Sequence, residues 1–203
     1  ALGSDSGASL RVPAACCGIV GFKPSHGLVP LEGCFPVAPS FDHAGPMARD
    51  VASCATALRA LAPAFEPRAL DSLEEVRVAI VWLEDADPLV RARVEDAAVQ
   101  FPWRESLDLP RPEGVSRLFM HEVAGVHAEL FAENADLYGE DLRIKIERCL
   151  EVSEGAADRA ARRRDEYREL VEERLAGFDL VLSPTLPFAA PLLGAGGTGD
   201  LAV

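Results

Sequence analysis

Apolar residues recur along this 203-residue chain with two spacings, which predict strands in some segments and helices in others. Residues 76–82 are almost continuously apolar, as in a strand that is buried on both faces. Asp50 is a helix-capping residue type, and a helical repeat follows it through about Leu61, with one face made of Val51, Cys54, Ala55, Leu58 and Leu61. Pro88 suits the first turn of another helix, whose apolar positions are Leu89, Val90, Val94 and Ala97.

The second half of the chain reads as helical over residues 114–176, in three segments divided near 136–139 and 153–155. Apolar stripes run along the first segment (Phe119, Val123, Val126, Leu130) and the last (Tyr167, Leu170, Val171, Leu175). Residues 17–23 and 178–182 predict short strands, 63–71 a linker, and 99–109 no clear element. Strands that alternate with helices in this way indicate an α/β fold.

Residues 3–11, Gly-Ser-Asp-Ser-Gly-Ala-Ser-Leu-Arg, form the segment that says most about chemistry. A serine that attacks a carbonyl carbon needs backbone N–H groups about 3 Å from the oxygen on which negative charge develops. The small residues Ser6, Gly7 and Ala8 keep this turn thin, so that their amides and that of Ser9 can converge on one oxygen. A Ser/Gly-rich turn is by itself typical of ordinary loops, so the flanking sequence decides.

The flanking sequence carries a resemblance. Residues 3–27, which continue through Leu-Arg-Val-Pro-Ala-Ala-Cys-Cys-Gly-Ile-Val-Gly-Phe-Lys-Pro-Ser-His-Gly, closely resemble the core signature of the amidase signature family, serine hydrolases that cleave carboxamides. Residues 38–49, 134–139 and 179–187 resemble later segments of that family, in the same order. The resemblance implies an α/β domain with a mixed sheet flanked by helices. It also implies hydrolysis of a carboxamide C–N bond through a serine acyl-enzyme, without metal or organic cofactor.

Residue by residue, the resemblance assigns Ser9 as the catalytic nucleophile and the backbone N–H groups of Ser6, Gly7, Ala8 and Ser9 as the oxyanion hole. Asp5 and Arg11 match the family pattern as structural supports of the turn. The chain departs from the pattern at Ala8, where the family usually has glycine. The added methyl group is harmless at negative φ and costs roughly 1–2 kcal/mol in the left-handed region.

Family members use a Ser-Ser-Lys triad, in which a desolvated neutral lysine takes a proton through a bridging serine. Both partners precede the nucleophile segment, and only eight residues precede Ser9 here. Lys23 and Lys145, the two lysines of the chain, match no such position. We therefore expect an internal fragment of one amidase domain, incomplete at both ends, with little or no activity alone. Residues 1–62 would bear the nucleophile, 72–188 would supply strands and helices, and 189–203 would form a flexible tail.

Other functions stay open at this point. The chain could belong to an amidotransferase subunit that generates ammonia by the same chemistry, or to a non-catalytic amidase-fold scaffold. A Ser/His/Asp triad of Ser9, His43 and Asp42 is not excluded by spacing, since triads are defined in space. Adjacent Asp42 and His43 would nevertheless make an awkward orienting pair.

Charge and composition limit the partners. The chain has 33 acidic and 20 basic residues, a formal net charge of −13, which argues against a nucleic-acid groove or an anionic membrane surface. No apolar run approaches the roughly 20 residues that span a bilayer, so we expect a cytoplasmic protein that binds a small-molecule amide substrate. The five cysteines have no metal-ligand spacing and predict reduced thiols.

Overall fold

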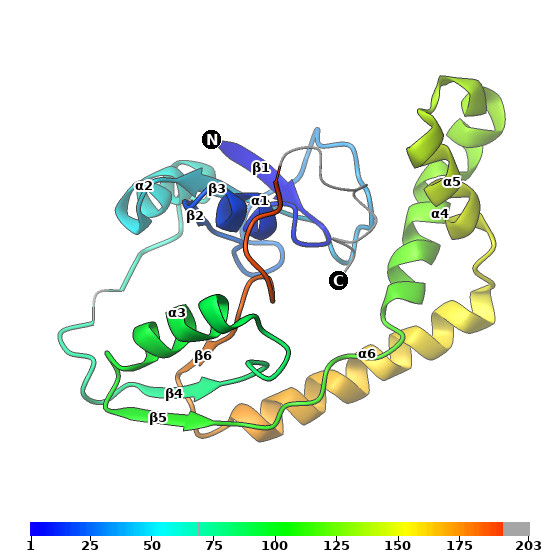
Figure 1. Ribbon diagram of the computed structural model, residues 1–203. Coiled ribbons are helices and arrows are strands. Elements are labelled where there is room, and N and C mark those ends of the chain that lie inside the picture. Colours follow the sequence, from blue (N-terminus) through cyan, green and yellow to red (C-terminus); the bar gives the residue numbers. More distant parts are fainter. Residues whose placement is uncertain (69, 193–203) are drawn as a thin grey trace.

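The computed structural model describes residues 1–68 and 70–192, which form two groups of strands with helices beside them (Figure 1). In chain order the elements are β1 (Leu2–Asp5), α1 (Arg11–Cys16), β2 (Val20–Gly21), β3 (His43–Ala48), α2 (Val51–Leu61), β4 (Arg77–Ile80), α3 (Pro88–Ala98), β5 (Trp103–Ser106), α4 (Ser116–Asn134), the 3-10 helix η1 (Ala135–Leu137), α5 (Glu140–Leu150), α6 (Glu154–Leu175) and β6 (Leu180–Leu182). The α/β class expected from the sequence is confirmed.

The first sheet is antiparallel, with the strand order β1-β3-β2. Its register places Gly3 opposite Gly45 and Asp5 opposite His43. Gly45 has to be glycine here, because a Cβ at this position would lie 2.1 Å from the carbonyl oxygen of Phe22. The close approach lets the chain that follows β2 pass directly over β3.

The second sheet is parallel, with β4 between β5 and β6. Val78, Ala79 and Ile80 of β4 are all buried, as are Val76 and Val81 beside it. Consecutive buried residues mean that both faces of this strand are covered, as the apolar run predicted. The strands in the described part of the chain thus form one antiparallel and one parallel sheet.

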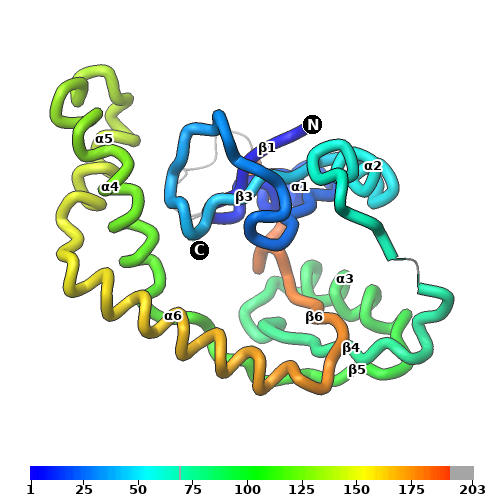
Figure 2. Tube along the Cα trace, turned by 180° about the vertical axis from the view of Figure 1, so that it is seen from behind, coloured from blue at the N-terminus to red at the C-terminus, as the bar shows by residue number. Residues whose placement is uncertain are grey.

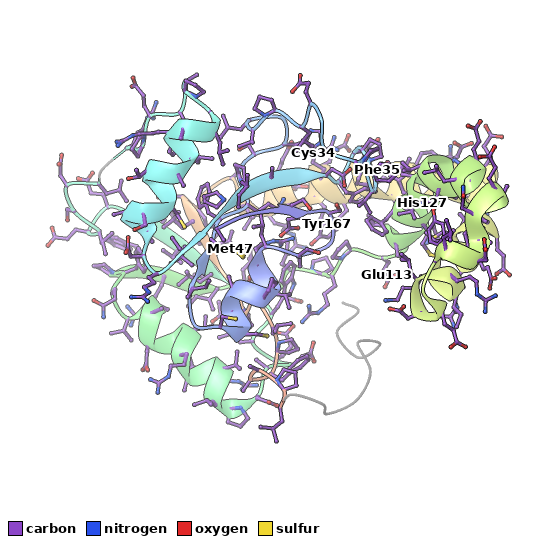
Figure 3. All side chains as sticks on the ribbon, turned by 90° about the horizontal axis from the view of Figure 1, so that it is seen from above. Cys34, Phe35, Met47, Glu113, His127 and Tyr167 are labelled. Carbon is purple, nitrogen blue, oxygen red and sulfur yellow. The ribbon has the colours of Figure 1, made fainter. Side chains whose placement is uncertain are left out.

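The helices α4, α5 and α6, which we call the helical arm, extend away from the two sheets (Figures 1 and 2). The loop between β2 and β3 reaches this arm, and Figure 3 shows Phe35 of the loop beside His127 of α4, with the ring centres 5.7 Å apart. In the loop, Ala38 is completely buried and packs with Val123 of α4 and with Ile146 and Cys149 of α5. The loop therefore connects the antiparallel sheet to the helical arm.

Most of the predicted elements are present. The helix after Asp50 is confirmed as α2, and the Asp50 carboxylate accepts a hydrogen bond from the Ser53 amide at 2.7 Å. The helix that begins at Pro88 is confirmed as α3, and the three helical segments over 114–176 are confirmed as α4, α5 and α6. The predicted strand over 178–182 is β6.

Other predictions need correction. The strand expected over 17–23 is only two residues long, and α1, which was not predicted, precedes it. Val51 and Leu89, two of the apolar helix positions, are 68% and 59% exposed. The segment 99–109, left without an element, contains β5. Most of the tail expected over 189–203 lies outside the described residues. Among residues 1–68 and 70–192, no helix is both long enough and apolar enough to cross a membrane.

Candidate active site

The turn that carries Ser9 lies between the end of β1 and the start of α1. Pairing with β3 fixes the end of β1, since Asp5 is held opposite His43. Beyond the turn, the Val12 amide donates to the Ala8 carbonyl at 2.9 Å, which begins the helical backbone of α1. Pro13 falls in the first turn of this short helix, where proline costs no hydrogen bond. Ser9 therefore sits where a strand changes into a helix, and its side chain is exposed.

Asp5 is the centre of the contacts within the turn. Its side chain is only 1% exposed. One carboxylate oxygen accepts the Ala8 amide at 2.8 Å and the other accepts the Leu10 amide at 3.2 Å. Arg11 adds two hydrogen bonds of 3.0 Å, from Nε and from a terminal nitrogen, in a bidentate ion pair. These are the contacts that a brace of the turn requires.

The charge state of Asp5 follows from this geometry. Burial alone would raise the pKa of the carboxyl group, but the Arg11 guanidinium and the Ala8 and Leu10 amides lower it from 3.8 to about 2. Asp5 is thus ionised throughout the neutral range and accepts all of these hydrogen bonds.

Ala8 adopts a left-handed backbone conformation, with φ of 86°. The sequence had left two outcomes open for this departure from glycine, and the structure shows the strained one. A non-glycine residue in this region costs about 1–2 kcal/mol. The bond between the Ala8 amide and Asp5, together with the bond from Val12, holds the backbone there.

The four amides proposed for the oxyanion hole are not equivalent. The Ala8 amide is already bound to the Asp5 carboxylate. In the described part of the chain, the amides of Ser6, Gly7 and Ser9 donate to no protein acceptor. Gly7 also has open space where a Cβ would lie. The turn that bears the exposed serine therefore carries three N–H groups that have no acceptor among the described residues.

A residue outside the turn also contacts it. The Ser6 hydroxyl donates to the buried carboxylate of Asp42, which also accepts the amides of Val37 and Ala38. Burial raises the pKa of Asp42, and these hydrogen bonds, with the nearby His43, outweigh that effect and lower it. In the sequence, Asp42 is a candidate only for the alternative triad with Ser9 and His43. Nothing in its spacing of 36 residues from Ser6 signals this contact.

The alternative triad of Ser9, His43 and Asp42 is not assembled. His43 Nδ1 donates to the carbonyl oxygen of Phe41 at 2.6 Å, so Nε2 is the acceptor for Lys23 Nζ at 3.3 Å. Asp42 is bound to Ser6 and to two backbone amides, as described above. Neither side chain has the partner that a Ser/His/Asp relay needs.

Lys23 was set aside on sequence grounds, and the structure gives it a specific place. Partial burial, followed by the charge of Arg11, lowers its pKa, while Asp5 acts in the opposite direction. Its ammonium group contacts His43. The other lysine, Lys145, lies on α5 in the helical arm.

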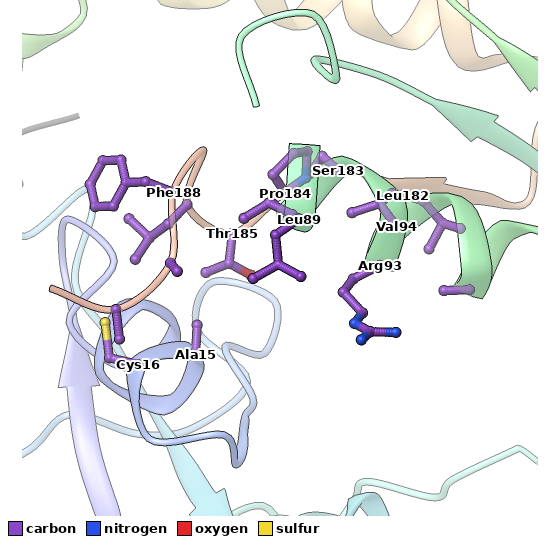
Figure 4. Close-up of a pocket in the computed structure, with 15 residues that line it drawn as sticks. Ala15, Cys16, Leu89, Arg93, Val94, Leu182, Ser183, Pro184, Thr185 and Phe188 are labelled. Atoms are coloured by element: carbon purple, nitrogen blue, oxygen red, sulfur yellow. The ribbon is translucent and has the colours of Figure 1, made fainter. Parts of the chain in front are cut away.

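A cavity of about 580 Å³ lies between α1, α3 and residues 182–190 (Figure 4). Ala15 and Cys16 line it from α1, and Leu89 and Val94 from α3. Thr185, from the segment that resembles a family motif, also lines it.

In the chain outside residues 69 and 193–203, no group of His, Cys, Asp or Glu side chains could hold a metal ion.

Comparisons with known proteins agree with this fold. A family model described as Amidase matches residues 1–100. A structure described as a crystal structure of amidase is 32% identical, with a TM-score of 0.83, over 96% of this chain and 46% of its own. The chain belongs to the amidase signature family.

Two curated relatives are named for different activities. A glutamyl-tRNA(Gln) amidotransferase subunit of Neisseria gonorrhoeae is 30% identical over 96% of this chain and 51% of its own length. AtzE, a 1-carboxybiuret hydrolase subunit of a Pseudomonas species, is also 30% identical, over 95% of this chain and 47% of its own length. The chain thus spans about half the length of these relatives.

Proposed function

We propose that the chain supplies the nucleophile and oxyanion hole of an amidase that hydrolyses a carboxamide C–N bond. The observation that carries the proposal is an exposed Ser9 on a turn where the Ser6, Gly7 and Ser9 amides have no protein acceptor in the described residues. Donors of this kind stabilise the negative charge of a tetrahedral intermediate, because they need no rearrangement during the reaction.

In the proposed reaction, Ser9 Oγ attacks the carbonyl carbon and loses its proton to a base. The carbonyl oxygen becomes an oxyanion that the three free amides bind. The C–N bond then breaks, the leaving nitrogen takes up a proton, and an acyl ester remains on Ser9. Water attacks this ester and releases the carboxylic acid and the free serine.

Within the described residues, neither lysine is placed to act as the base for the first step. Lys23 is engaged with His43, and Lys145 lies on the helical arm. The Ser-Ser-Lys triad implied by the resemblance places the lysine and bridging serine before the nucleophile segment. We therefore propose that the isolated chain has little or no activity. Loss of one member of a cooperative triad removes most of the rate.

The test joins the chain, at Ala1, to the preceding segment of the matched amidase, which would supply the lysine and the bridging serine of the triad. We expect this chimera to hydrolyse an aryl amide, and mass spectrometry of quenched reactions to find the acyl group on Ser9. Ser9→Ala should lose at least about 10³-fold in kcat. Ser4→Ala, an exposed serine on β1, is the matched control and should keep full activity.

Turnover that survives in the Ser9→Ala chimera, or an acyl group on another residue, would refute Ser9 as the nucleophile. Turnover by the isolated chain that Ser9→Ala abolishes would instead refute only the proposed inactivity. The two parts of the proposal are thus tested separately.

A second candidate is transamidation, in which the released ammonia passes to an acceptor. The relative from Neisseria gonorrhoeae, which is named as part of an amidotransferase, favours it. AtzE, which is named as part of a hydrolase, is equally identical to this chain, so identity ranks neither role higher. Ammonia that appears free in solution in step with product acid would favour hydrolysis.

A further inference from the structure

Asp42 joins two segments that are far apart in the sequence. Its carboxylate accepts the Ser6 hydroxyl on one side and, on the other, the amides of Val37 at 2.9 Å and Ala38 at 3.1 Å. The side chain is 8% exposed, so water cannot readily replace these partners. One buried carboxylate thus connects the nucleophile turn to the loop before β3.

On the loop side, the helical arm packs against Ala38, which donates to Asp42, and against the neighbouring Phe41. Ala38 is completely buried against Val123, Ile146 and Cys149, and the ring of Phe41 meets Phe119 edge-to-face at 5.5 Å. Apolar packing therefore fixes the backbone that donates to Asp42.

Polar contacts fix the loop as well. The Ser40 amide donates to the Glu122 carboxylate at 2.8 Å, and the Ser40 hydroxyl bonds to the same carboxylate. Arg164 of α6 donates to the Ser40 hydroxyl at 2.9 Å, and its guanidinium lies 5.7 Å from the centre of the Phe41 ring. The loop is thus bound to both α4 and α6.

On the turn side, Ser6 is the first of the residues whose amides are free. Its hydroxyl bond to Asp42 limits rotation of the Ser6 side chain and, through it, of the adjoining peptide to Gly7. The Asp5 carboxylate accepts the amides of Ala8 and Leu10, but within the described residues it accepts no hydrogen bond from Ser6 or Gly7. Asp42 supplies the restraint that Asp5 does not.

We propose that Asp42 is a positioning residue, through which the seating of the helical arm on residues 37–41 sets the orientation of the free amides at Ser6, Gly7 and Ser9. The functional meaning of this coupling rests on the proposed oxyanion hole. Contact between the arm and the loop would then be required for a well-formed hole. Any change that lifts the arm would loosen the turn.

The test uses amide resonances of the ¹⁵N-labelled chain and needs no turnover, so it can fail independently of the proposed function. In Asp42→Asn we expect hydrogen exchange at Val37 and Ala38 to become about 10- to 100-fold faster, as for loss of bonds to a charged group. The Gly7 and Ser9 resonances should also shift more than those of Gly18 and Gly27, which lie outside the turn. Equal shifts at all four would overturn the proposal.

A cycle of two variants distinguishes the proposed positioning role of Asp42 from a purely structural role. Glu122→Ala releases Ser40 from α4 and should shift the Gly7 and Ser9 resonances in the parent chain. In the Ser6→Ala background, where the turn has no bond to Asp42, the same change should leave them in place. Identical shifts in both backgrounds would overturn the proposal, and this cycle decides the matter if Asp42→Asn does not fold.

Discussion

Asp5→Asn is the change that most directly tests the internal brace of the nucleophile turn. The variant keeps the size of the side chain but removes the charge that accepts four hydrogen bonds, from Ala8, Leu10 and Arg11. Lowering a carboxyl pKa from 3.8 to about 2 corresponds to about 2.5 kcal/mol of stability at neutral pH. Arg11 is 44% exposed, so water can solvate it once Asp5 is neutral. We therefore expect a loss of about 2–3 kcal/mol, below the usual cost of stranding a buried charge.

The pH dependence gives the sharper test. Because the folded pKa of Asp5 is depressed, its contribution is fully present above pH 3.8 and is lost as the pH falls through 2. The difference in the free energy of unfolding between the parent chain and Asp5→Asn should be constant from about pH 7 to 5. It should fall to about half near pH 3.

Urea unfolding at about pH 7, 5 and 3 measures both quantities. Asp85→Asn is the matched control, because it removes the same charge from an exposed ion pair with Arg111 and should cost less than about 1 kcal/mol at each pH. The brace would be refuted if the stability cost of Asp5→Asn were within about 0.5 kcal/mol of the cost of Asp85→Asn, because that difference is roughly the error of such measurements. A cost that does not change across this pH range would also refute it.

Three other predictions follow from single residues. Ala8→Gly should stabilise the chain by about 0.5–1 kcal/mol, since relief of the strain at φ 86° exceeds the entropy cost of glycine; a lower melting temperature would contradict this. NMR titration of Lys23 should give a pKa below 10.5. Between that lowered pKa and pH 10.5 the unfolded chain holds more protons than the folded chain, so the parent should gain stability relative to Lys23→Met as the pH rises. Stability profiles of the two proteins that run parallel over this pH range would count against the prediction. Thiol reagents should label the exposed Cys34 well before the buried Cys54 and Cys149, and burial also raises the pKa of Cys149; equal labelling rates would contradict this burial.

Local patterns in the sequence predicted the elements whose causes are local. The Asp50 cap, the proline that begins α3 and the apolar run of β4 each act within a few residues, and each appears in the structure. α1 was missed because its six residues include a proline and follow a turn rich in small residues. Its helical form depends on the Ala8 carbonyl, which accepts the Val12 amide from a strained conformation.

The candidate site likewise combines residues that a local motif indicates with long-range contacts that no local motif indicates. Asp5, Arg11 and Ser9 lie within a single short stretch of the chain, so a sequence motif could indicate them together. The contacts of Ser6 with Asp42 and of Lys23 with His43 span 36 and 20 residues, and each depends on the pairing of strands. No spacing rule within a single segment indicates such contacts.

The β1–β3 register explains why two separate stretches of sequence are needed for one turn. Asp5 lies opposite His43, so the residues just beyond this pair, Ser6 and Asp42, meet at the end of the sheet. A shift of one residue in this register would turn every side chain of β1 to the other face and would separate Ser6 from Asp42. Residues 3–27 and 38–49, which resemble two family segments, thus form one structural unit. The first bears the nucleophile, and the second supplies the carboxylate that we propose to orient the turn.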